Sequence, residues 1–130
     1  MILRERYVSF ETAKILRKKG FNGLCSAYYD CFTTDNLHEG NEPTNFNEID
    51  PKIRDIVSAP TLQMACEWLR RIYKLEITPL HEMFQGNSWW YRIERNTSLS
   101  LITEYEEDAI FGSYEQACDE AIKYALENLI

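Results

Sequence analysis

The strongest helical periodicity in the chain belongs to Ser113-Tyr-Glu-Gln-Ala-Cys-Asp-Glu-Ala-Ile-Lys-Tyr-Ala-Leu-Glu-Asn-Leu-Ile130. Its apolar residues recur at the spacing of three and four that places them on one helix face. The inward set is Tyr114, Ala117, Cys118, Ala121, Ile122, Ala125, Leu126 and Leu129. Ser113 is of the type that caps the free amides of a first helical turn. The segment therefore predicts a helix that starts at Tyr114, with an apolar inner face and an acidic outer face.

Two earlier segments begin in the same way, Ser9-Phe-Glu-Thr-Ala13 and Thr61-Leu-Gln-Met-Ala65. Each predicts a capped helix, over residues 10–19 and 62–73. Gly20 suits the left-handed residue that ends the first helix, and Phe21 is expected to fold back onto it. The three caps are evenly spaced, but the segments between them do not match, so we attribute the pattern to shared cap chemistry and not to a repeat.

Between the helices, short apolar and aromatic runs predict strands over residues 25–32, 53–57 and 75–77, the last stopped by Pro79. Alternating residues over 88–105 predict a hairpin with its turn at 96–98. The resulting order of elements predicts a single α+β domain over residues 1–130. It would contain a small antiparallel sheet of about three to four strands, covered by two to three helices.

Composition narrows the functional classes. The 130 residues are 45% hydrophobic and carry a net charge of −7, which is typical of a folded acidic protein. No apolar run approaches the length of a membrane span, and the N-terminus lacks the order of a secretory signal. Four scattered cysteines are expected to be reduced. We therefore predict a cytoplasmic location and no membrane partner. The polar stretch 35–51 is the longest predicted loop.

Charge is unevenly placed along the chain. Residues 1–24 contain six basic and two acidic side chains, a net charge of +4. Residues 104–130 contain one basic and eight acidic side chains, a net charge of −7. Ends of opposite sign attract one another within one molecule or between two, so a homodimer is one alternative. The acidic cluster Glu104, Glu106, Glu107 and Asp108 is a candidate contact for a partner.

Three segments carry a resemblance to a known group. They are Tyr7-Val-Ser-Phe-Glu-Thr-Ala-Lys-Ile-Leu-Arg-Lys-Lys-Gly-Phe21, Ala59-Pro-Thr-Leu-Gln-Met-Ala-Cys-Glu-Trp-Leu-Arg-Arg-Ile72 and the C-terminal run 113–130. They resemble short uncharacterised proteins encoded by phages and mobile elements of gut Bacteroides-type bacteria. The resemblance implies a cytoplasmic accessory protein of a prophage. That group has no known activity, so it assigns no site residue to this chain.

Metal and catalytic sites find little support in the sequence. Cys25, Cys31 and His38 lie close together along the chain, but the two cysteines are separated by five residues, wider than the spacing of a zinc knuckle. Cys66, His81 and Cys118 lie on separate elements that can bring them together in space as metal ligands, but both cysteines fall on predicted helix cores, so buried thiols are expected. A small hydrolase would need His38 to reach Cys25 or Cys31. We expect no enzyme, no cofactor, no catalytic residue and no metal ligand.

Two binding hypotheses remain. Trp89-Trp-Tyr-Arg-Ile-Glu-Arg95 interleaves aromatic and arginine residues, which is typical of a platform that stacks single-stranded nucleic acid. The acidic net charge opposes that function, so nucleic acid is a disfavoured partner. A solvent-facing Trp90 beside Arg92 also suits a protein interface. We favour a non-enzymatic protein-interaction or regulatory role with a host or phage protein, through Trp68, Trp90, Arg92 and the acidic cluster.

Overall fold

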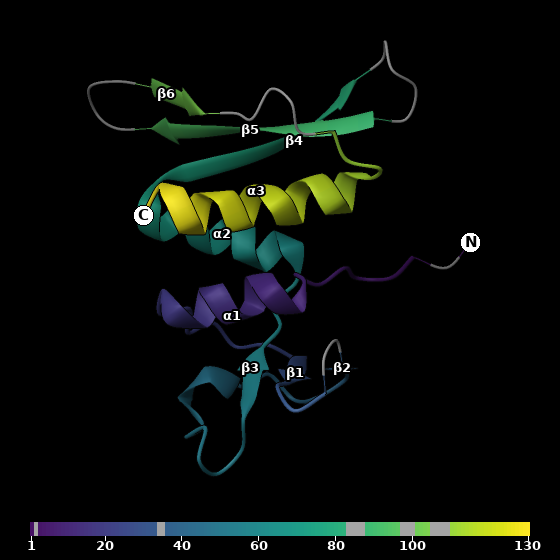
Figure 1. Ribbon diagram of the computed structural model, residues 1–130, viewed down its shortest axis with the longest axis vertical. Coiled ribbons are helices and arrows are strands. Elements are labelled where there is room, and N and C mark those ends of the chain that lie inside the picture. The colour runs from purple at the N-terminus through teal and green to yellow at the C-terminus, as the bar shows by residue number, and fades with distance from the viewer. Residues whose placement is uncertain (2, 34–35, 83–87, 97–100, 105–109) are drawn as a thin grey trace. The chain divides into compact units, whose positions relative to one another are not determined.

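Three capped helices begin where the sequence predicts them. This computed structural model describes the whole chain except residues 2, 34–35, 83–87, 97–100 and 105–109. The helices are α1 (Phe10–Lys18), α2 (Leu62–Tyr73) and α3 (Tyr114–Asn128) (Figure 1). The hydroxyl oxygens of Ser9, Thr61 and Ser113 accept hydrogen bonds from backbone amides three residues later, at 3.2, 3.1 and 3.1 Å. All three predicted caps are confirmed.

The strands form two antiparallel sheets. The first has the order β2–β1–β3 and the second the order β4–β5–β6. The α+β class and the antiparallel pairing are confirmed, although the strands divide between two three-stranded sheets and do not form one. The chain falls into two compact units, Met1–Ala65 and Cys66–Ile130, and each is described by itself. That residues 1–130 form one domain stays a prediction.

The first unit places α1 against β3. β1 (Tyr28–Asp30) lies between β2 (Asn36–His38) and β3 (Ile56–Ser58). β1 is shorter than the strand predicted over residues 25–32. β3 is shifted toward the C-terminus relative to the strand predicted over residues 53–57. The predicted loop 35–51 contains β2 and a short 3-10 helix, η1 (Phe46–Glu48). The core of this first unit contains Val8, Phe10, Ala13, Leu16, Phe21, Ala27, Tyr28, Tyr29, Phe46, Ile56 and Val57.

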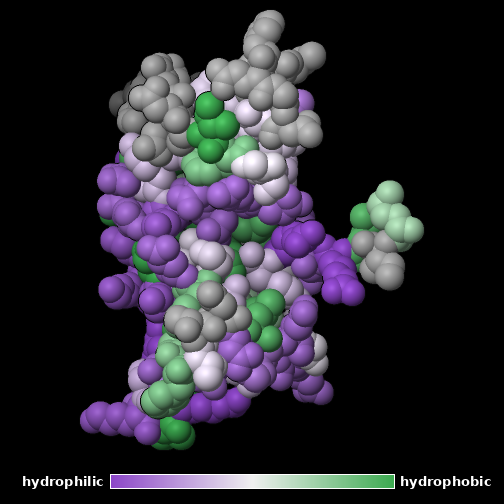
Figure 2. Space-filling view, turned by 45° about the vertical axis from the view of Figure 1, so that its right-hand side comes forward, coloured by the Kyte–Doolittle hydropathy of each residue, from purple (hydrophilic) through white to green (hydrophobic). Residues whose placement is uncertain are grey.

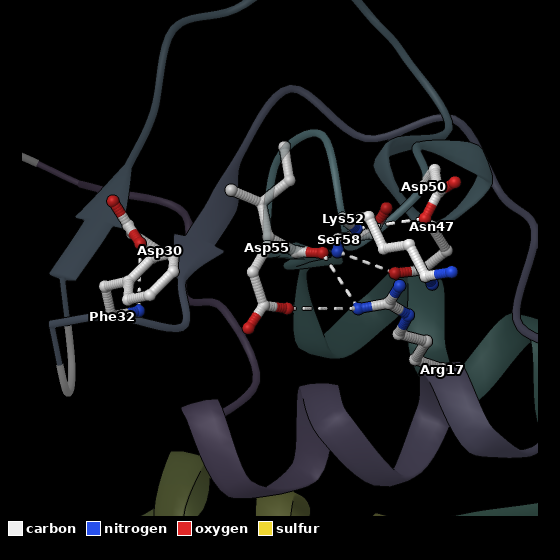
Figure 3. Close-up of polar contacts among 9 residues, drawn as sticks. Arg17, Asp30, Phe32, Asn47, Asp50, Lys52, Asp55 and Ser58 are labelled. Atoms are coloured by element: carbon white, nitrogen blue, oxygen red, sulfur yellow. Dashed lines mark hydrogen bonds and ion pairs between the residues drawn. The ribbon is translucent and has the colours of Figure 1, made fainter.

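Polar contacts connect these short elements. In Figure 3, the guanidinium of Arg17 on α1 reaches the carboxylate of Asp55 at 3.8 Å and the backbone carbonyl of Ile56 at 3.2 Å. The side-chain oxygen of Asn47 accepts a hydrogen bond from the backbone amide of Ser58 at 2.9 Å. Three-residue strands make few ladder bonds, so these side-chain contacts help to hold β3 in place.

The end of α1 follows the prediction. Gly20 has a φ of +89°, in the left-handed region, and the backbone amide of Phe21 donates to the carbonyl of Leu16 at 3.0 Å. The Phe21 side chain is buried. This is the left-handed helix stop with its apolar contact.

In the second unit, α3 runs along one side of a sheet built from β4 (Leu75–Glu82), β5 (Ser88–Asn96) and β6 (Leu101–Glu104) (Figure 1). The buried face of α3 comprises Ala117, Cys118, Ala121, Ile122, Ala125 and Leu126, as predicted. Tyr114, expected to face inward, is 48% exposed because it occupies the first turn. On α2, Ile72 is 58% exposed, whereas Tyr73 is partly buried.

The prediction that Pro79 ends its strand is wrong. β4 continues to Glu82, and Pro79 lies opposite Tyr91 in the ladder. The amide and carbonyl of Trp89 both bond to Phe111, on the side of β5 away from β4. The alternation of an antiparallel ladder then directs the backbone groups of Pro79 away from β5. No ladder bond needs the missing proline N–H, and β4 is an edge strand.

Candidate functional site

One side of the β4–β5–β6 sheet has no described helix of its unit packed against it (Figure 1). Tyr91 and Ile93 of β5 are buried, and Tyr91 meets the ring of Tyr124 on α3 with 6.2 Å between centroids. Because side chains alternate along a strand, Trp90 and Arg92 point to the opposite side. Figure 1 shows α3 along one side of this sheet and no described helix of the unit along the other.

We define the open face as Thr78 and Leu80 of β4 with Trp90, Arg92 and Glu94 of β5. Leu80 lies directly opposite Trp90 in the ladder, and Thr78 lies opposite Arg92. All five side chains are partly buried. Directly opposed residues have close Cβ atoms and form a pair. The face therefore presents the apolar pair of Leu80 and Trp90 beside the polar pair of Thr78 and Arg92.

The charges of the open face are balanced. Arg92 Nε lies 2.6 Å from Glu94 Oε1, two residues along the same strand face. Glu76, opposite Glu94 in the ladder, forms an exposed ion pair with Arg70 of α2 at 3.4 Å. Because a carboxylate neutralises each of these two guanidinium groups, the face has little net positive charge to attract a phosphate backbone.

The other arginine of the hairpin is used inside the fold. Arg95 donates a hydrogen bond from Nη2 to the backbone carbonyl of Leu129, the C-cap residue of α3. This guanidinium is only partly exposed. The alternating aromatic and arginine pattern of residues 89–95 therefore serves two sides of a sheet, with Trp90 and Arg92 on one side and Arg95 on the other.

The predicted contact residues do not all meet on this face. Trp68 lies on α2, with its ring at the edge of the Tyr73 ring at a centroid distance of 5.4 Å. Glu104 ends β6, where its backbone pairs with Ile93 of β5. Glu106, Glu107 and Asp108 lie outside the described residues. The structure thus brings Trp90 and Arg92 together and leaves the acidic cluster without a described geometry.

Two thiols meet in the second unit. Cys66 Sγ of α2 lies 3.6 Å from Cys118 Sγ of α3, within hydrogen-bonding distance for sulfur. Cys118 is buried, whereas Cys66 is partly exposed. The hydrogen bond from Cys118 is the main cause that lowers the pKa of Cys66, with a further contribution from Arg70. The same contact, together with burial, raises the pKa of Cys118. The two sulfurs are therefore chemically unequal.

The sequence allows Cys66 and Cys118 to approach each other and predicts buried thiols, but it does not show that the two sulfurs meet. A signal for their meeting was present, because each cysteine lies five positions after its helix cap, Thr61 or Ser113. Residues at the same number of positions after the cap lie at the same distance along the axis from the start of their own helix. That equality alone does not tell which helices pack together.

The other thiols and both histidines occupy separate places. Burial raises the pKa of Cys25 to about 11, and the pKa of Cys31 is raised by burial and by the carboxylate of Asp55. His38 stacks on Tyr28 and His81 tilts against Trp89, with centroids 4.8 and 4.9 Å apart. Within the described ranges, no group of three or more His, Cys, Asp or Glu side chains is placed to hold a metal ion.

The first unit has a groove of about 560 Å³ between the N-terminal segment and the β1–β2 pair. It is lined by Arg4, Glu5, Arg6, Tyr7, Tyr29, Leu37 and Glu39. Two arginines and two glutamates give the lining no net charge. Tyr29 donates its hydroxyl to the carbonyl of Val8 at 2.6 Å, so this phenol supports the fold. The groove favours no class of ligand.

One face of the molecule shows dispersed apolar residues. On the side drawn in Figure 2, the described apolar residues form separate green areas among hydrophilic ones. Dispersed apolar residues are ordinary on a protein surface. No helix among the described residues combines the length and apolarity needed to cross a membrane. Searches against family models, curated proteins and solved structures find no match to this chain.

Proposed function

We propose that the chain is a protein-interaction module that binds a basic partner through the open face. The observation that carries this proposal is the Leu80–Trp90 pair, which lies on the side of the sheet opposite α3. Aromatic residues beside aliphatic ones are common at the centre of protein interfaces, where a few such residues supply most of the affinity.

Charge indicates the kind of partner. Residues 66–130 contain six basic and twelve acidic side chains, a net charge of −6. Opposite charge speeds encounter and excludes wrong partners. We therefore expect a positively charged protein surface that presents an apolar side chain to Leu80 and Trp90. The resemblance of the sequence makes a host or phage protein in a bacterial cytoplasm the partner to look for.

The paired charges favour a protein over single-stranded nucleic acid. A stacking platform needs exposed aromatics together with arginines that are available to phosphates. Here Arg92 is next to Glu94, and Arg95 binds the carbonyl of Leu129. A protein partner can contact this neutral, partly apolar face while the Arg92–Glu94 and Arg95–Leu129 contacts stay intact.

Affinity capture from a Bacteroides-type lysate tests the proposal when it compares variants. The bait is the full chain, with Trp90→Ala and Leu80→Ala as test variants. Ile72→Ala is the matched control, because Ile72 is an exposed apolar residue on α2. A true partner should survive nuclease treatment, bind the control normally and lose about tenfold or more in affinity with Trp90→Ala. Far-UV circular dichroism checks that each variant folds.

Three results would overturn the proposal. Retention that disappears with nuclease would transfer the function to nucleic acid, and a labelled single-stranded oligonucleotide would then bind with strong dependence on salt. Partners that bind Trp90→Ala as well as the parent would exclude the open face. Self-association that Trp90→Ala abolishes, measured by sedimentation, would make a second copy the occupant.

A further inference from the structure

The Cys66–Cys118 pair is independent of the open face and has a chemistry of its own. Its sulfurs are 3.6 Å apart, and a disulfide bond requires about 2.05 Å. The sulfurs therefore need to approach by roughly 1.5 Å before the bond forms. Cys25 and Cys31 have no sulfur partner among the contacts of the described residues.

The pair is asymmetric in access. Cys66 is partly exposed, whereas only 4% of Cys118 is exposed, so Cys66 is the outer residue of the pair. A reactive site of this kind needs an outer sulfur that attacks and an inner sulfur that completes the bond.

The charged surroundings favour attack by the outer sulfur. Arg70, one turn after Cys66 on α2, stabilises a Cys66 thiolate, and Glu76 of β4 opposes it. Near Cys118, the carboxylates of Asp119 and Glu115 on α3 disfavour a second negative charge. The proton of the pair therefore stays on Cys118.

We propose that Cys66 and Cys118 form a reversible dithiol site that reacts with low-molecular-weight disulfides, with Cys66 as the attacking residue and Cys118 as the resolving residue. The substrate class is a small disulfide such as glutathione disulfide.

The exchange balances in two steps. The Cys66 thiolate attacks one sulfur of glutathione disulfide, forms a mixed disulfide and releases one glutathione thiolate. Cys118 then gives its proton to water and attacks Cys66 Sγ, which releases the second glutathione thiolate. The protein loses two electrons and two protons and becomes an intramolecular disulfide, and the oxidant becomes two molecules of glutathione. Excess reduced thiol reverses both steps.

The experiment uses the full chain with Cys25→Ser and Cys31→Ser, so that only the two proposed thiols remain. The probe is glutathione disulfide, followed by intact mass and by free-thiol titration. The expected product lacks two hydrogens, has no free thiol and yields a peptide that joins Cys66 to Cys118. Further replacement Cys118→Ser should trap one glutathionyl group on Cys66. Cys66→Ser should slow the reaction by about tenfold or more.

Two controls keep the test decisive. The parent chain and Cys31→Ser should form the linked peptide at the same rate, because Cys31 is partly exposed but has a raised pKa. Peptide mapping of the parent chain replaces the double variant if that variant does not fold. The proposal is overturned if the folded chain does not react, if glutathione attaches first to Cys118, or if two separate mixed disulfides accumulate without a link.

Discussion

Arg95 of β5 donates a hydrogen bond from its guanidinium to the carbonyl of Leu129, the C-cap of α3. The last turn of α3 contains no basic side chain, so the sheet supplies the positive charge that favours the negative end of this helix. An arginine that the sequence associates with nucleic acid thus connects the sheet to its covering helix.

Replacement Arg95→Met should lower the free energy of unfolding by about 1 to 2 kcal/mol, because a charged hydrogen bond to a helix end is lost. Urea unfolding followed by circular dichroism measures the change. Arg71→Met is the control, since Arg71 forms an exposed pair with Glu67 at 2.9 Å. That variant should change stability by less than about 1 kcal/mol. Equal effects of the two variants would remove the assigned role of Arg95.

The position of Pro79 gives a contrast within one strand. Pro79→Ala should retain the fold and change the free energy of unfolding by about 1 kcal/mol or less, because its backbone points away from β5. Thr78→Pro should cost about 1 to 3 kcal/mol, because the ladder directs the Thr78 amide toward β5 and proline leaves its partner there without a donor. Chemical denaturation of the two variants is the measurement. A mild effect of Thr78→Pro would show that the assigned alternation is shifted by one residue.

Local signals predicted the helices well. The bounds 62–73 of α2 agree with the structure, and so do the caps, because cap chemistry and apolar spacing act within a few residues of the chain. Gly20 was identifiable for the same reason. Its left-handed φ is a local requirement that other residues meet poorly.

Pairing over long distances was not predictable from the same signals. β2 lies within a polar stretch, and its three residues become a strand because β1 offers them a ladder. The sequence predicts that Pro79 ends its strand, because it does not show whether the backbone groups of Pro79 point toward β5 or away from it. The sequence predicts the alternation of residues 89–94 between the two sides of the sheet. It does not predict the Arg92–Glu94 contact or the Cys66–Cys118 contact, which depend on how the side chains and helices pack.

The cap of the last helix should contribute measurably to stability. Ser113→Ala removes the oxygen that accepts from the Gln116 amide at 3.1 Å, and the expected loss is about 1 kcal/mol. Ser113→Asp is the matched control, because aspartate also accepts at this position and suits the positive end of the helix. Thermal unfolding of the three proteins compares them. If Ser113→Asp is as unstable as Ser113→Ala, the hydroxyl has another role.

The buried thiol of Cys25 should make stability depend on alkaline pH. Burial raises its folded-state pKa from 9.0 to about 11, against a small opposite effect of Ser58. A thiol with a raised folded-state pKa stabilises the fold fully at pH values below its unfolded pKa, and this contribution is lost as pH rises from about 9 to about 11. The loss should reach at most about 3 kcal/mol, because each unit of pKa difference is worth about 1.4 kcal/mol.

Other groups titrate in the same range, so the measurement is a difference between two proteins. Urea unfolding of the parent chain and of Cys25→Ser at several pH values from neutral to alkaline isolates the thiol. The serine hydroxyl does not ionise there, and the thiol contact with the carbonyl of Gly23 at 3.7 Å has a hydroxyl counterpart. The stability advantage of the parent over Cys25→Ser should shrink as pH rises. A constant difference would mean that Cys25 ionises in the folded chain as it does in the unfolded one.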